Sequence, residues 1–254
     1  MAINILILTD YSAPAYNAAK YALNLPTGPS NFYLLHAGTP NEMGIQNCLE
    51  KLIKEPTARG HSFHALEIPG NLIDATRKLV AEKDIDLIVM GASGDSSEHL
   101  RGLGTNTYNV LRKVKCPVLT VTEKQEFKAW ENLLFPIDYS VISQNNMLGI
   151  LKKLPLLAAS VFNVLEINGN SSPALPVTEI RNELNIRLSP NPVKFKPVID
   201  KTHLGGEFWK KARSGANLVV LMARNLKISD ELLLHPPKSK KRLSTRPPIL
   251  ILHG

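Results

Sequence analysis

The chain contains an internal repeat, and this feature constrains its fold more than any other. An apolar run that ends in Asp10-Tyr11-Ser12 returns as a second apolar run that ends in Asp138-Tyr139-Ser140. Self-similarity at a fixed offset indicates that one structural unit occurs twice. The sequence therefore predicts two tandem copies of one domain, residues 1–125 and 128–254, joined near residues 123–130. Two further pairs of segments match in the same way: residues 86–90 with 217–221, and residues 116–121 with 247–252.

Each copy alternates short continuous apolar runs with amphipathic stretches long enough for helices. This pattern is typical of a parallel sheet that is covered on both faces. Parallel neighbours need right-handed crossovers, so we expect two tandem doubly wound, five-stranded parallel sheets with helices on both faces, a Rossmann-like α/β fold. In the first copy, strands are expected near residues 3–8, 31–36, 62–68, 86–90 and 118–122, with helices beginning near Ser12, Asn41, Asn71 and Thr105. In the second copy, strands are expected near residues 132–137, 160–166, 194–199, 217–222 and 248–252.

The composition narrows the class of protein. The chain is 44% hydrophobic and has 2 cysteines, which excludes a disulfide scaffold, and its opening residues lack the pattern of a signal peptide. We therefore expect a cytoplasmic protein without a membrane segment. The formal charge of +8 falls in the second copy, much of it in residues 238–246. Such a run is usually a solvated face, so nucleic-acid binding is not favoured, although an anion could bind there in another way.

The segment after the fourth expected strand carries the strongest chemical signal. Gly91 and Gly94 allow a close approach of the backbone to a ligand, and Gly104, Thr105 and Asn106 lead into a helix. Amides at a helix N-terminus favour an anion, so this loop is expected to bind phosphate. At Gly104 we further expect a backbone conformation that disfavours a branched side chain.

The glycine spacing G-x2-G-x9-G-[ST], placed between a strand and a helix, resembles the ATP-binding type of universal stress protein. Asp10 at the end of the first strand and Cys116-Pro117-Val118 before the last strand add to this resemblance. It implies an adenine nucleotide alpha hydrolase-like fold, with ATP, with or without Mg²⁺, bound in the first copy only. It also implies contacts to the ribose and adenine from Thr9 and Asp10, and to the adenine from the backbone groups of His36 and Ala37. It implies contacts to the phosphates from Gly91, Ser93, Gly94, Gly104, Thr105 and Asn106, with Met90 among the binding residues.

Several residues keep a second interpretation. Asp10 could cap the helix that begins at Ser12, and His36 could be an ordinary strand-end residue. Arg101 could pair with a phosphate or face solvent. Cys116 is interpreted as a buried packing residue, and no metal site is expected.

The second copy departs from the nucleotide motif. Met222 and Asn225 stand where the first copy has glycines, and His235-Pro236-Pro237 stands where it has Gly104, Thr105 and Asn106. Proline has no N–H to donate, so the second copy is interpreted as a degenerate domain without a nucleotide.

Three classes of function follow. The favoured one is a stress-response regulatory protein whose adenine nucleotide, either ATP or a relative such as AMP, changes a surface read by an unidentified protein partner. The alternatives are a slow ATPase or a nucleotidyl- or phosphoryl-transfer enzyme, for which no clear general base is present, and a scaffold without a ligand. The apolar last strands are expected to hold the two copies as an intramolecular pseudo-dimer, with a homodimer as a further arrangement.

Overall fold

The structure is a computed structural model of the 254-residue chain. It describes residues 2–25, 28–92, 104–138, 157, 159–167, 176–199, 204–223, 232 and 247–253. The chain divides into two compact units, Met1–Phe127 and Lys128–Gly254, and each is described by itself.

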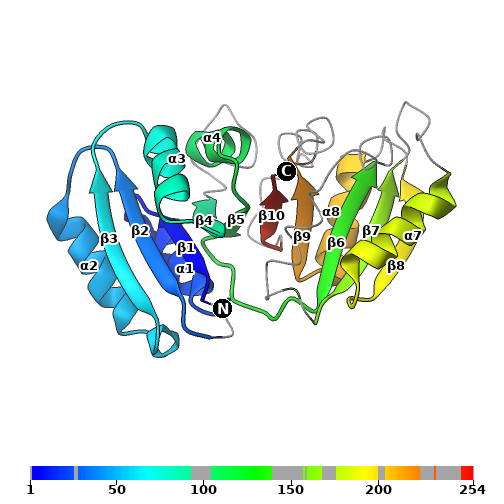
Figure 1. Ribbon diagram of the computed structural model, residues 1–254, viewed down its shortest axis with the longest axis horizontal. Coiled ribbons are helices and arrows are strands. Elements are labelled where there is room, and N and C mark those ends of the chain that lie inside the picture. Colours follow the sequence, from blue (N-terminus) through cyan, green and yellow to red (C-terminus); the bar gives the residue numbers. More distant parts are fainter. Residues whose placement is uncertain are drawn as a thin grey trace. The chain divides into compact units, whose positions relative to one another are not determined.

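The first unit is a parallel sheet with strand order β3-β2-β1-β4-β5 (Figure 1). The order reverses between β1 and β4, so the chain leaves these two neighbouring strands in opposite directions. In sheets of this kind, ligands bind in the crevice at that point, beyond the carboxyl ends of the strands. Its elements are β1 (Asn4–Leu8), α1 (Ala13–Ala22), β2 (Asn31–Ala37), α2 (Glu42–Ile53), the 3₁₀ helix η1 (Pro56–Ala58), β3 (Ser62–Ile68), α3 (Leu72–Glu82), β4 (Leu87–Ala92), α4 (Thr105–Lys113) and β5 (Val118–Thr122).

The second unit repeats this topology with the order β8-β7-β6-β9-β10, again with parallel neighbours. The expectation of a doubly wound α/β fold used twice is therefore confirmed, and the expected strands lie within one or two residues of those observed. Its described elements are β6 (Asn132–Asp138), β7 (Val161–Ile167), α7 (Val177–Leu188), β8 (Val193–Ile199), α8 (Leu204–Gly215), β9 (Leu218–Met222) and β10 (Ile249–Leu252).

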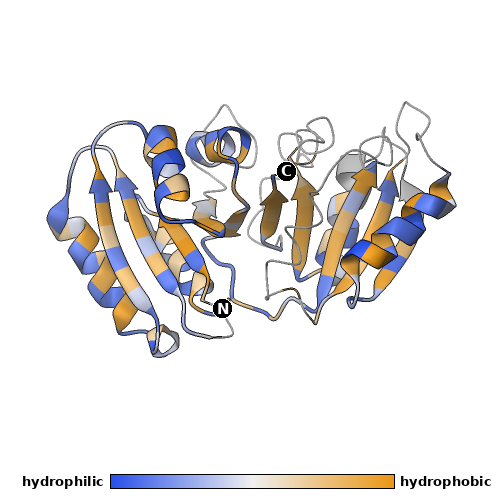
Figure 2. Cartoon of the chain, viewed as in Figure 1, coloured by the Kyte–Doolittle hydropathy of each residue, from blue (hydrophilic) through white to orange (hydrophobic). Residues whose placement is uncertain are grey.

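The central strands form the core of each unit. The side chains of β1 from Ile5 to Leu8 are at most 4% exposed, and those of β9 are at most 5% exposed. Figure 2 shows the same strands as almost continuously hydrophobic, while the helices carry hydrophilic residues on one side. Continuous apolar strands are expected where helices cover both faces of a parallel sheet. None of the helices in the described residues is long and apolar enough to cross a membrane.

Local capping residues set where three helices of the first unit begin. The side chains of Ser12, Asn41 and Asn71 accept hydrogen bonds from backbone amides in the first turns of α1, α2 and α3. Each cap satisfies an amide that has no partner within the helix. The expected starts at these three residues are therefore confirmed.

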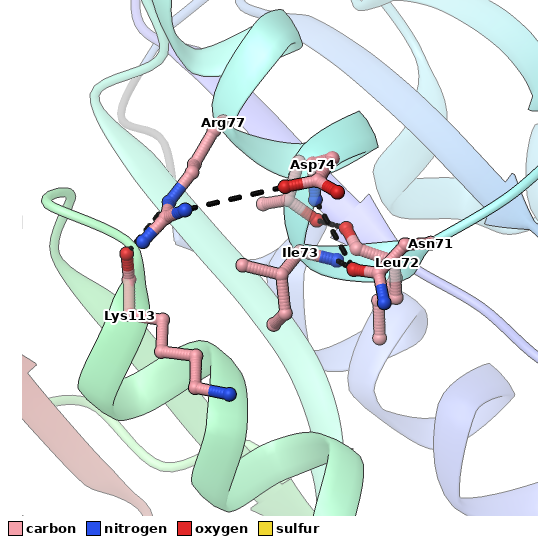
Figure 3. A network of polar contacts seen from close by, with 7 residues as sticks. Asn71, Leu72, Ile73, Asp74, Arg77 and Lys113 are labelled. Carbon is pink, nitrogen blue, oxygen red and sulfur yellow. Dashed lines mark hydrogen bonds and ion pairs between the residues drawn. The ribbon is translucent and has the colours of Figure 1, made fainter.

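The helices α3 and α4 are tied together by Arg77. Its Nε donates to the carbonyl oxygen of Lys113 at 2.9 Å, and its guanidinium lies 4.0 Å from Asp74 (Figure 3). The carbonyls at a helix C-terminus carry partial negative charge, so the cation is favourably placed there. This contact helps to fix α4, the helix that follows the expected phosphate loop.

Candidate functional site

Four residues from neighbouring strands lie at one level at the carboxyl edge of the first sheet. The amide of Thr9 donates to the carbonyl of Leu35 at 2.9 Å, which extends the β1–β2 ladder by one residue. His36 pairs with Glu67, and Gly91 follows Met90, the partner of Leu8. Successive side chains of a strand point to opposite faces. The side chains at the level of Thr9, His36 and Glu67 therefore share one face, and the residues one position later point to the other.

Gly91 shows which face this is. A Cβ atom at Gly91 would lie 2.6 Å from the carbonyl carbon of Pro14 and 2.8 Å from the amide nitrogen of Ala15. The first turn of α1 thus rests directly on Gly91, and only glycine leaves room for this approach. Thr9, His36 and Glu67 therefore point toward the face covered by α1. Gly91 has a packing role that sequence reasoning missed, whereas its expected contact with phosphate stays a prediction.

Gly91 also contacts α4. The hydroxyl of Thr107, a buried residue in the first turn of α4, donates to the Gly91 carbonyl at 3.2 Å. The N-terminal turns of α1 and α4 are thus both anchored to this glycine at the end of β4. The anchor brings the start of α4 to the point where the strand order reverses.

The first turn of α4 differs from those of α1, α2 and α3, which side chains cap. Gly104 is its N-cap residue, and no side chain of the described residues caps its amides. Thr105 and Asn106 are exposed, and the turn holds no acidic side chain, whereas Arg112 and Lys113 occupy the last turn. Exposed amides at a helix N-terminus favour a bound anion. Gly104 has φ −61° and ψ 155°, which any residue adopts, so the expectation of a restrictive backbone conformation at this glycine is wrong.

Asp10 is exposed and lies beside the start of α1. Its Oδ1 accepts from the amide of Ser12 at 3.0 Å and from the Ser12 hydroxyl. The Ser12 hydroxyl oxygen in turn accepts from the amide of Ala15 at 3.4 Å. Ser12 is therefore the helix cap, and Asp10, two residues before it, supports it. The second carboxylate oxygen of Asp10 has no partner in the part of the chain that the structure describes.

Tyr11 has an unusual backbone conformation, with φ at 64°. This left-handed region costs an L-residue about 1–2 kcal/mol, so surrounding contacts must hold Tyr11 there. Its hydroxyl donates to Glu67 Oε1 at 3.0 Å, and its ring centroid lies 4.5 Å from that of His36. Burial and the neighbouring Glu67 carboxylate raise the pKa of the Tyr11 phenol, which therefore remains a hydrogen-bond donor at neutral pH.

The His36 side chain is occupied within the protein. Its Nδ1 lies 3.1 Å from the Thr9 carbonyl oxygen, and its Nε2 lies 3.2 Å from the Thr39 carbonyl oxygen. These contacts and the Tyr11 ring match the alternative interpretation of His36 as a strand-end residue. The adenine contact that was expected from backbone groups at His36 and Ala37 stays a prediction, and the next amide, that of Gly38, donates to the Ile68 carbonyl at 3.2 Å.

The second unit has an ion pair with a buried glutamate where the first has His36. Glu166 is the sixth residue of β7, as His36 is of β2, and its side chain is 5% exposed. Arg181 of α7 donates to both carboxylate oxygens at 2.6 Å, and its guanidinium lies 5.1 Å from the centre of the Phe195 ring. Asp138 is buried, whereas its counterpart Asp10 is exposed. The described strand ends of the two units thus differ in chemistry although their topology is the same.

Several expected residues lie outside the described part of the chain. In the first unit these are Ser93, Gly94 and Arg101, and in the second unit Asn225, His235, Pro236, Pro237 and residues 238–246. Among the described residues, no group of three or more His, Cys, Asp or Glu could hold a metal ion. Cys116 is buried and its thiol donates to the Ile85 carbonyl at 3.4 Å. Burial raises its pKa to about 12, which fits a packing role better than a nucleophile.

Sequence reasoning missed Tyr11, Glu67 and Thr107 as parts of this region. Tyr11 belongs to the repeated Asp-Tyr-Ser segment, which was a usable signal. Glu67 and Thr107 have no local pattern that distinguishes them. Their partners are 56 and 16 residues away in the chain, so only the fold brings them together.

The comparisons with known proteins agree with this description. Residues 45–122 match the model of the universal stress protein family. A universal stress protein from Archaeoglobus fulgidus DSM 4304 superposes with a TM-score of 0.65 at 14% identity, covering 98% of this chain and 97% of that one. The cytoplasmic domain of a prokaryotic cation chloride cotransporter superposes with a TM-score of 0.60 at 10% identity, covering 100% of this chain and 96% of the other.

One of these two structures is a universal stress protein and the other is a domain of a cotransporter, and both share this fold. The fold alone therefore does not define the function. No curated protein sequence matches the chain. The family match covers α2 almost completely and then every element from β3 through β5, together with the residues between β4 and α4. The first unit therefore contains a universal stress protein domain, and the second unit repeats its topology.

Proposed function

We propose that the first unit is a regulatory domain that binds one adenine nucleotide per chain, with ATP as the first ligand to test. The observation that carries this proposal is the start of α4, whose first-turn amides are uncapped among the described residues and are anchored to the end of β4 by Thr107. A phosphate group would supply the missing acceptor, and the dipole of α4 would favour its negative charge.

Asp10 supports the nucleoside part of this proposal. It lies at the end of β1, the strand next to β4, and is exposed with one carboxylate oxygen unpartnered in the described residues. A carboxylate accepts hydrogen bonds from ribose hydroxyls, as acidic residues do in other doubly wound nucleotide-binding domains. Asp10 and the first turn of α4 would then hold opposite ends of a nucleoside phosphate across the switch point.

The second unit is proposed to lack this ligand. Its Glu166–Arg181 ion pair fills the place where the first unit has a histidine. In the sequence, two prolines replace the residues that would donate to phosphate. We therefore expect a stoichiometry of one nucleotide per chain, and a protein whose output is a binding event rather than turnover.

The test is to identify and then titrate the ligand. Mass spectrometry of small molecules released from the denatured purified protein is expected to detect an adenine nucleotide. Calorimetric titration of the nucleotide-free protein with ATP is expected to give one site per chain. Two equivalent sites, or no binding of ATP, ADP or AMP, would contradict the proposal, and rapid release of phosphate would favour the enzyme alternative.

The variant Gly104→Val locates the site. The branched side chain would stand at the first-turn amides of α4, so we expect ATP affinity to fall at least about tenfold, which corresponds to the loss of one charge-assisted hydrogen bond. The Gly104 backbone angles suit valine, so the fold should remain intact. Gly215→Val is the matched control, because Gly215 ends α8 in the second unit and has open space around it. Unchanged affinity in a folded Gly104→Val protein would place the phosphates elsewhere.

A further inference from the structure

We infer that Tyr11, anchored by Glu67, is the positioning residue that holds Asp10 in its ribose-binding orientation. This inference rests on the proposed function. It concerns two residues on the α1 side of the sheet edge, which a hydrogen bond joins to each other. Their proposed role is to set the conformation of the segment between β1 and α1.

The backbone of Tyr11 determines how the chain turns after Asp10. With φ at 64°, the chain reverses its direction at this residue, between the end of β1 and the cap of α1. The amide of Tyr11 donates to Thr9 Oγ1 at 3.0 Å, and the amide of Ser12 donates to Asp10 Oδ1 at 3.0 Å. Both bonds depend on the same turn. If Tyr11 returned to a right-handed or extended conformation, the Ser12 amide would leave the Asp10 carboxylate.

The contacts of the Tyr11 side chain oppose that return. Its hydroxyl donates to Glu67 Oε1, which also accepts from the amide of Asn41 at 2.7 Å. The ring lies against His36 on one side. It also lies close to α2, because a Cβ atom at Gly44 would be 3.0 Å from Tyr11 Cε2. The side chain is therefore attached to β2, β3 and α2, and these attachments hold a backbone conformation that tyrosine by itself disfavours.

The chain also contains a tyrosine–glutamate pair that serves as a matched control. Tyr16, on α1, donates to Glu55 Oε1 at 3.1 Å. Its bond has the same chemistry and nearly the same length as that of Tyr11, but Tyr16 lies within a regular helix and not in the turn next to Asp10. Removing the Tyr16 hydroxyl therefore tests the loss of such a bond without disturbing Asp10.

The experiment compares ATP with 2′,3′-dideoxy-ATP, which lacks both ribose hydroxyls, by calorimetric titration. If Asp10 binds the ribose, the wild-type protein prefers ATP by about tenfold, and Asp10→Ala removes this preference. We expect Tyr11→Phe and Glu67→Ala to reduce the preference to about threefold or less while the affinity for the dideoxy compound stays unchanged. Glu67→Gln should restore part of it, because its amide oxygen still accepts from the tyrosine. Tyr16→Phe should leave the preference at its wild-type value.

A second measurement needs no ligand. Hydrogen exchange of the Ser12 amide, followed by NMR, is expected to be several-fold faster in Tyr11→Phe than in the wild type, and unchanged in Tyr16→Phe. The inference is overturned if exchange at Ser12 is unaffected, or if Tyr11→Phe keeps the ATP preference that Asp10→Ala removes. If the wild type binds no nucleotide, or if Asp10→Ala keeps the preference, the proposed function or its ribose contact fails, and the exchange rates alone decide the positioning role.

Discussion

Replacing Gly91 by alanine tests whether this glycine is needed for packing rather than for contact with a ligand. A Cβ atom would lie 2.6–2.8 Å from three backbone atoms of Pro14 and Ala15, well inside the 3.4 Å at which ordinary contacts begin. The first turn of α1 would have to move away by roughly 0.8 Å. Because the obstructing atoms belong to the backbone, no side-chain rotation relieves the clash.

The expected cost follows from this geometry. Overpacking of a core position costs about 1–3 kcal/mol, and a backbone clash belongs at the upper end of that range. Alanine recovers about 0.5–1 kcal/mol by restricting the unfolded chain. The net loss in the free energy of unfolding of the first unit should therefore be about 2 kcal/mol. With a typical urea dependence, this lowers the midpoint of urea unfolding by about 1 M.

The positions of the tryptophans make the assay specific for the first unit. Both tryptophans of the chain, Trp130 and Trp209, lie in the second unit and are buried. Far-ultraviolet circular dichroism reports on both units, whereas tryptophan emission reports on the second. Gly91→Ala should shift the circular dichroism transition and leave the fluorescence transition in place. Gly28→Ala, in open space within the same unit, is the control and should change stability by less than about 0.5 kcal/mol.

Two results would refute this reasoning. If Gly91→Ala unfolds at the same urea concentration as the wild type, α1 does not depend on the absence of a Cβ atom at this position. If the variant keeps its stability and loses only nucleotide affinity, Gly91 acts through the ligand, as the resemblance to ATP-binding universal stress proteins implies.

Two further predictions concern charge. Arg181→Met should lower the stability of the second unit by about 2 kcal/mol, because it leaves the buried Glu166 carboxylate without the half-exposed cation that binds it. Tryptophan-detected urea unfolding measures the loss. Equal stability would mean that water replaces the arginine. Burial raises the pKa of Cys116 from 9.0 to about 12, and burial with the Glu55 hydrogen bond raises that of Tyr16 from 10.0 to about 12. Between these pH values the folded state keeps protons that the unfolded state releases. The first unit should therefore lose stability as the pH rises from about 9 to about 12. A free energy of unfolding that does not change over this range, measured by circular dichroism, would contradict the prediction.

The outline of the fold could be predicted from the sequence because its signals are local. Apolar runs mark the strands, and a capping residue such as Ser12 or Asn71 lies within four residues of the amide that it satisfies. The repeated Asp-Tyr-Ser segment then indicated two copies of one unit. The same kind of local signal placed Asp10 and Gly104 at a strand end and a helix start, where the structure has them.

The tertiary structure decided what these residues do, because that depends on contacts between segments far apart in the chain. Gly91 was predicted to approach a ligand, which stays a prediction, and the structure adds that its missing side chain leaves room for the first turn of α1. The backbone of His36 was a candidate adenine contact, which stays a prediction, and strand register turns the His36 side chain toward Tyr11 and the α1 face. Glu67 and Thr107 gave no signal at all. The sequence alone determined the strands, the helix starts and the repeat, since these depend on neighbouring residues. Only the pairing of strands and the packing of helices decided which side chains face the site, since strand register and the approach of a helix are set by residues distant in the sequence.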